Sequence, residues 1–134
     1  MKFMSFGKDG GPESKVWGFW LIEIKSLFSI VLLRFENGTR SAYHNHAFNC
    51  FSWLLSGELL ETIITEDKTN PSQTKRYYPS IFGFPTYRTT FHQVNSIGTS
   101  YVLSFRGPWA KTWKEYIPKE DKTLTLTNGR KVVE

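Results

Sequence analysis

Short apolar segments separated by turn-forming residues run along most of the chain, and they constrain its fold more than any other feature. The segments are rich in aromatic and β-branched residues, which favour strands, and glycine, proline or asparagine lies between them. The predicted strands cover residues 16–24, 27–35, 44–55, 58–65, 76–79, 81–84, 89–94, 100–105 and 123–127. A helical turn is predicted only around residues 109–116. Eight or more short strands with regular turns predict an all-β sandwich or barrel.

The chain has 134 residues, enough for one domain with a substantial core. Residues 1–15 contain four glycine or proline residues among polar ones, which predicts a flexible N-terminal arm. Residues 16–134 are then expected to form the single domain. Residues 27–35 are apolar on both strand faces, as in the inner layer of a sandwich or in a dimer contact. Asn128-Gly129 predicts a terminal hairpin. A homodimer, paired edge to edge or by exchange of this hairpin, is compatible with the sequence.

Charge and composition limit the kinds of molecule that this chain is expected to bind. The chain carries 17 basic and 12 acidic residues, a net charge of +5, which favours acidic or phosphorylated small ligands. No basic run exceeds two residues, so we expect no nucleic-acid polymer as a partner. A single cysteine excludes an intrachain disulfide and fits a reducing cytoplasm. The most apolar stretch, residues 27–33, is too short to span a bilayer, and the first ten residues do not resemble a signal peptide. We therefore expect a cytoplasmic protein without membrane contact.

His44-Asn45-His46 is the most informative motif for function. Side chains alternate along a strand, so both imidazoles point to the same face. The chain has one further histidine, His92. If the fold brings it to the same place, three imidazoles suit a divalent metal with open coordination positions. The alternative is that these are buried polar histidines that bridge strands.

Two patterns in this β-rich context resemble the signatures of the cupin superfamily. The first consists of Gly38, His44, His46, Cys50 and Gly57, and the second of Gly83-Phe84-Pro85, His92 and Asn95. Most cupins have glutamate at the position of Cys50. In the second pattern the glycine expected after the proline is missing, and Asn95 comes one residue early. The resemblance covers about residues 27 to 106.

This resemblance implies a cupin-type jelly-roll barrel, or double-stranded β-helix, with a metal in its mouth bound by His44, His46 and His92. With Cys50 in place of the glutamate, the metal would meet three neutral imidazoles, which suits Fe(II), with Zn, Mn or Ni as alternatives. The chain also partly resembles the thiol dioxygenases, cupins that oxidise a small thiol with Fe(II) and oxygen. Their cysteine can be cross-linked to a tyrosine. They carry a Ser-His-Tyr relay, for which this chain has no fourth histidine, so a small buried hydrophobe is the alternative for Cys50.

Further candidates surround this motif. Arg88 shares strand parity with His92, which would place its guanidinium beside the metal as a clamp for a carboxylate or phosphate. Arg106 is a second candidate for that role. Glu61 lies in the middle of an apolar strand, so it is an arginine partner or a general base, unless it lies on the surface. A set of aromatic residues is expected in the core or the barrel lining: Trp53, Tyr101, Phe105, Trp109 and Trp113.

Three functions remain open on the sequence. The first is a metal-dependent cupin enzyme, an Fe(II) oxygenase that acts on a small anionic substrate. The second is a non-enzymatic cupin that binds a nucleotide or metabolite, with the histidines serving as hydrogen-bonding groups. The third, a structural protein built on a jelly roll, explains the doubly apolar strand but not the histidines.

Overall fold

The computed structural model describes residues 1–9, 14–38, 43–64, 71–88, 90–117, 122–127 and 131–132. All regular structure in these ranges is β-strand. The strands are β1 (Lys2–Lys8), β2 (Val16–Ile24), β3 (Phe28–Phe35), β4 (Tyr43–His44), β5 (Cys50–Ser56), β6 (Leu59–Ile64), β7 (Pro71–Tyr77), β8 (Phe84–Thr86), β9 (Phe91–Ser96), β10 (Ser100–Arg106), β11 (Thr112–Ile117), β12 (Lys122–Thr127) and β13 (Lys131–Val132).

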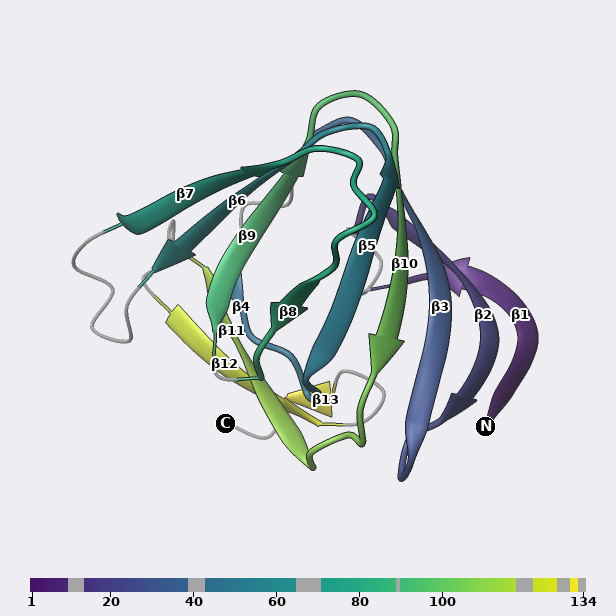
Figure 1. Ribbon diagram of the computed structural model, residues 1–134. Coiled ribbons are helices and arrows are strands. Elements are labelled where there is room, and N and C mark those ends of the chain that lie inside the picture. The colour runs from purple at the N-terminus through teal and green to yellow at the C-terminus, as the bar shows by residue number, and fades with distance from the viewer. Residues whose placement is uncertain are drawn as a thin grey trace.

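These strands form two antiparallel sheets that face each other (Figure 1). The six-stranded sheet has the order β1-β2-β3-β10-β5-β8, and the seven-stranded sheet has the order β13-β12-β11-β4-β9-β6-β7. From β3 onward the chain repeatedly crosses between the sheets, so that strands distant in sequence become neighbours, as β3 and β10 do. This is a jelly roll, and the predicted all-β class is confirmed.

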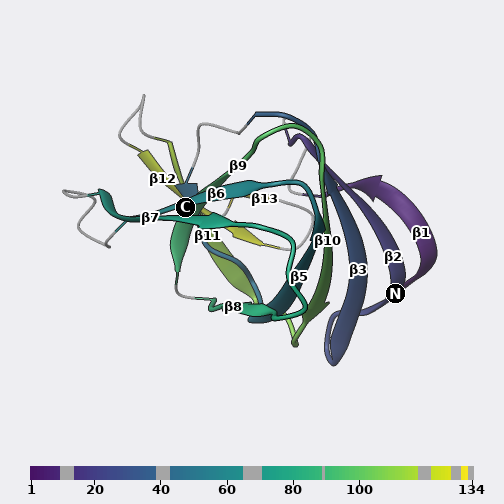
Figure 2. The same ribbon diagram turned by 45° about the horizontal axis from the view of Figure 1, so that its top comes forward.

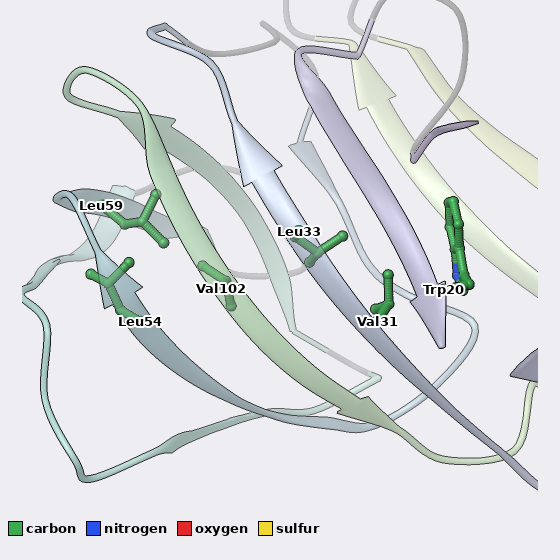
Figure 3. Close-up of a cluster of buried hydrophobic side chains, with 6 residues drawn as sticks. All are labelled: Trp20, Val31, Leu33, Leu54, Leu59 and Val102. Carbon is green, nitrogen blue, oxygen red and sulfur yellow. The ribbon is translucent and has the colours of Figure 1, made fainter. Parts of the chain in front are cut away.

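The apolar core lies between the sheets, against the inner face of the six-stranded one. Its buried side chains come from β2, β3, β5, β6 and β10: Trp20, Val31, Leu33, Leu54, Leu59 and Val102 (Figure 3). Strand alternation explains why these residues are buried, because every second side chain of β3, β5 and β10 points inward. Three of these core residues, Leu33, Leu59 and Val102, also border the cavity between the sheets.

The N-terminal segment differs from the prediction. Lys2–Lys8 is not a flexible arm but the edge strand β1, which pairs with β2 from Lys2 opposite Glu23 to Lys8 opposite Trp17. The glycine and proline content suggested a loop. However, three of these four residues, Gly10, Gly11 and Pro12, follow the strand in the sequence. Within the strand, Phe3 and Phe6 lie opposite apolar residues of β2. The helical turn predicted around residues 109–116 is also wrong, because Thr112–Ile117 is β11.

The aromatic residues divide between two faces. Trp109 and Trp113 line the cavity between the sheets, as expected. Trp53, Tyr101 and Phe105 instead lie on the opposite, outer face of the six-stranded sheet, because they have the other strand parity from the buried Leu54 and Val102. Their predicted place in the core or lining is therefore wrong.

At the C-terminal end, β12 pairs with β13, with Thr127 opposite Lys131. This confirms the pairing predicted on either side of Asn128-Gly129, while those two residues lie outside the described ranges. Among the residues that the structure describes, no helix could cross a membrane.

Candidate metal centre

A cavity of about 260 Å³ lies between the two sheets and is bordered on one side by residues of the apolar core. Its wall contains all three histidines of the chain, together with Glu61 and Arg106. Aromatic side chains from the loops and from β11 complete this wall, among them Phe48, Trp109 and Trp113. The cavity therefore combines an apolar lining with a few convergent polar groups, as small-molecule sites do.

The three histidines meet at one point. His44 and His92 are direct cross-strand partners in the β4–β9 pair. The three ring centroids lie 4.8–4.9 Å apart, and one nitrogen from each ring can be chosen so that all lie within 4.8 Å of one another. Nitrogens bound to one transition metal lie about 3 to 3.5 Å apart. Small side-chain rotations therefore suffice for the three rings to hold one ion.

His46 reaches this point from a loop rather than from a strand. The chain leaves the seven-stranded sheet after His44 and enters the six-stranded sheet at Cys50. Asn45 holds the chain at the point where it leaves the sheet. Its N–H donates to the carbonyl of Lys114, and its side-chain oxygen accepts from the N–H of Lys114. The prediction that residues 44–55 form one strand with common parity is thus wrong. The predicted convergence of His44, His46 and Cys50 on one interior is confirmed, since all three line the cavity.

His92 is held by a carboxylate. Its Nδ1 lies 2.5 Å from Oε2 of Glu61, and the hydroxyl of Tyr77 donates to Oε1 of Glu61 at 3.0 Å. Burial alone would raise the pKa of the Glu61 carboxyl, but the bonds from His92 and Tyr77 and the charges of His92 and Lys75 outweigh it, so this pKa lies below its ordinary value. In the neutral ring, a carboxylate that accepts from Nδ1 keeps the single proton there and leaves Nε2 with a lone pair.

The Nε2 atom of His92 is buried and has no hydrogen-bond partner among the described residues. An unpaired buried nitrogen is costly in an ordinary core. In a metal ligand it is expected, because histidine ligands usually give their second N–H to a carboxylate or carbonyl and keep the first nitrogen for the ion. The residues present therefore fit a divalent transition metal.

Two of the three alternatives given above for Glu61 are wrong. It is only 6% exposed, so it does not lie on the surface, and its hydrogen-bond partners are His92 and Tyr77 rather than an arginine. Glu61 lies opposite Val94 in the β6–β9 pair, one alternation from His92 on the same face. Only this register brings the acid to the ring, and so sequence reasoning could not pair them.

Arg88 lies on the surface and is not among the side chains that line the cavity. Its predicted position beside His92 is wrong. The parity argument assumed a strand from residue 89, whereas β9 begins at Phe91 and the N–H of Thr90 donates to the carbonyl of Tyr87 in a turn. Strand alternation therefore does not extend to Arg88.

Arg106 is the arginine in the cavity wall. It is 5% exposed, stacks over Phe48 at 4.6 Å, and forms an ion pair with Asp9 at 2.6 Å. Burial would lower the pKa of the Arg106 guanidinium, but the nearby acid Asp9, with smaller effects of Cys50 and Glu23, raises it above its ordinary value. Arg106 therefore remains a cation inside the wall.

Cys50 is half-buried in the same wall, directly opposite Arg106 in the β5–β10 pair. The hydroxyl of Ser52 lies 4.0 Å from its sulfur and 3.1 Å from the hydroxyl of Ser104. Sequence reasoning missed two partners in this region, Tyr77 beside Glu61 and Asp9 beside Arg106. Asp9 is 97 positions from Arg106, and no local pattern links the two.

Glu61 gives a first prediction. Glu61→Gln is expected to weaken binding of Zn²⁺ about 10- to 100-fold, because an amide does not hold the His92 tautomer as a carboxylate does. Tyr77→Phe is the matched control, since it removes only one hydrogen bond from the same carboxylate. Its effect should be clearly smaller. Competition with a colorimetric chelator measures both affinities, and equal affinities for Glu61→Gln and the wild type would contradict this role of Glu61.

Comparison with known proteins places the fold. No protein-family model matches the sequence, and no curated protein matches it in a sequence search. Solved structures do match. A sugar phosphate isomerase from a cupin superfamily, from Silicibacter pomeroyi, has a TM-score of 0.59 at 14% identity, over 95% of this chain and 85% of that one. A cupin superfamily protein from Desulfitobacterium hafniense has a TM-score of 0.55 at 17% identity, over 75% and 84%.

A third similar structure is oxalate decarboxylase from Bacillus subtilis, studied for its Mn(II) centres. Its TM-score is 0.56 at 14% identity, over 73% of this chain and 26% of that larger one. The predicted cupin-type jelly roll is therefore confirmed as the fold. At these identities the likeness shows the fold alone.

Proposed function

We propose that this protein binds one divalent transition metal through His44, His46 and His92 and acts as an Fe(II)-dependent oxygenase on a small anionic substrate. The observation that carries the proposal is the buried Nε2 of His92, which has no hydrogen-bond partner among the described residues while Nδ1 is held by Glu61. Two further imidazoles lie within 5 Å of that ring. A bound Fe(II) would supply open positions for substrate and oxygen.

The residues around the cluster would position the substrate. Phe48 stacks on His46 at 5.1 Å between centroids and lies 4.6 Å from the guanidinium carbon of Arg106. The ring of His46 and the guanidinium are thus at most about 10 Å apart, which a small molecule can span. We assign to Arg106, rather than Arg88, the attraction of the anionic end. Phe48, Trp109 and Trp113 would pack against the remainder and exclude water.

Glu61 and Cys50 have different roles in this proposal. In this proposal Glu61, which contacts His92 and Tyr77 through hydrogen bonds, positions the His92 ring instead of acting as the general base. Cys50 faces the cavity beside Arg106, where its thiol would contact the substrate. The free cysteine and the absence of a membrane-spanning helix among the described residues are compatible with a cytoplasmic location.

Metal analysis tests the proposal. Protein purified without a histidine tag or chelators, then reconstituted anaerobically with Fe(II), is expected to hold about one ion per chain. Loading with Co(II) should give a visible spectrum that shifts when a small carboxylate binds at an open position. Less than about a tenth of an equivalent of any transition metal after reconstitution would refute the metal site. Metal uptake without a carboxylate response would refute the anionic substrate and leave the metal site standing.

A further inference from the structure

The central part of the outer face of the six-stranded sheet is apolar. It carries two unbroken rows of side chains, each crossing the five strands β1, β2, β3, β10 and β5. The first row is Phe6, Phe19, Leu32, Leu103 and Trp53, and the second is Phe3, Ile22, Ile30, Phe105 and Phe51. We call these ten residues the outer face.

This face lies away from the cavity. All thirteen strands belong to the two sheets, so no described strand forms a third layer over it (Figure 2). Several of its side chains are therefore open to solvent, with Phe3 exposed by 68%, Phe6 by 62%, Phe105 by 42% and Phe51 by 40%. Outward residues of a sheet that faces water are normally polar.

The exposed area is too large for an ordinary monomer surface. Together with Phe28, Leu55 and Tyr101 on the same side, which are 39–52% exposed, these side chains present about 700 Å² of apolar surface. The largest apolar patch on a typical monomer is about 300 to 600 Å². A stable interface buries about 800 Å² on each partner, which matches this face.

The distribution of charged side chains indicates which partner covers the outer face. Charged side chains lie in a third row of the same sheet face, beside the first apolar row. In this third row the ammonium group of Lys8 lies over the ring of Trp17, and Arg34 lies 3.7 Å from the carboxylate of Glu36. Neither apolar row carries a charge. Two copies of a chain with net charge +5 can therefore meet here without placing like charges against each other. An isologous contact between identical copies is the commonest way to bury such a patch.

We propose that the outer face is a homodimer interface, in which two copies pack their six-stranded sheets face to face. Two stacked sheets bury alternate side chains in a layer about 10 Å thick, as in a β-sandwich. The same strands carry cavity residues on their inner side, Arg106 on β10 and Cys50 on β5. The dimer thus covers the back of the wall that lines the site, whether or not a metal is bound.

Sedimentation of the full chain tests this proposal. The wild type is expected to be a dimer at about 10 µM, and Phe105→Lys is expected to raise the dimer dissociation constant at least about 100-fold, because a lysine would be buried against its copy. Phe3→Lys, in the same row at the sheet edge, should also weaken the dimer and provides a second variant if the first fails to fold. Ile97→Lys is the matched control, because Ile97 is 44% exposed in the β9–β10 turn and lies outside the outer face.

The proposal predicts that Ile97→Lys stays dimeric and that both phenylalanine variants, checked by circular dichroism, are folded monomers. A wild type that remains monomeric at about 100 µM would overturn it. So would a monomer that sediments with lipid vesicles instead, or a dimer that persists unchanged in both phenylalanine variants.

Discussion

Replacing His44 or His46 by alanine is expected to weaken binding of Zn²⁺ or Co²⁺ at least about 100-fold. Loss of a carboxylate behind a histidine ligand already costs about 10- to 100-fold, and loss of the ligand itself costs more. Because one nitrogen from each of three histidines forms the proposed donor group, each histidine contributes a third of the protein's ligands. Chelator competition measures the affinity, and Co²⁺ spectra report the change in coordination.

The controls separate metal binding from folding. Gln93 follows His92 in β9, and its side chain points to the opposite face of the strand. Gln93→Ala should therefore leave the affinity for the metal unchanged. His92→Ala should abolish binding and also destabilise the apo protein by about 3 kcal/mol, because it removes the ion-pair partner of the buried Glu61 carboxylate and leaves only the hydroxyl of Tyr77. If His44→Ala and His46→Ala both bind metal as tightly as the wild type, the proposed ligand set is wrong.

Gly57→Ala is expected to lower the free energy of unfolding by about 3 kcal/mol or more. Gly57 has φ of 97° in the turn between β5 and β6, where a side chain is strained. An added Cβ would also meet the hydroxyl of Ser100 and lie 2.6 Å from its Cα. That hydroxyl bonds to the N–H and carbonyl of Glu58, both at 3.1 Å, so the substitution would break the turn's connection to β10. Urea unfolding followed by tryptophan fluorescence gives the midpoint and slope.

Gly98 offers a matched control in the turn between β9 and β10. Its φ is 75°, also left-handed, but nothing lies within 4 Å of an added Cβ. Gly98→Ala should therefore cost only the conformational penalty, about 1 to 2 kcal/mol. Equal losses for the two variants would show that contact with Ser100 contributes nothing at Gly57.

Local sequence patterns predicted many of the strands, and the physical reason for success or failure differs from strand to strand. β3 was expected at residues 27–35 and is found at Phe28–Phe35, because its run of large aliphatic residues has no competing helical period. β1 was missed because glycines close to it outweighed two phenylalanines whose value depends on pairing with β2. Strand alternation failed at Arg88 and at His46, where the chain turns and the alternation stops.

The order of residues alone identified three histidines in two short patterns as a candidate site, because ligand type and spacing are properties of the chain. The tertiary structure decided which other groups reach them. Strand register places Glu61 beside His92 instead of on the surface or beside an arginine. Strand register and the crossing between sheets also place Arg106, and not Arg88, in the cavity wall, with Asp9 beside it. A shift of one residue in register reverses every side chain of a strand, and contacts between distant strands fix that register.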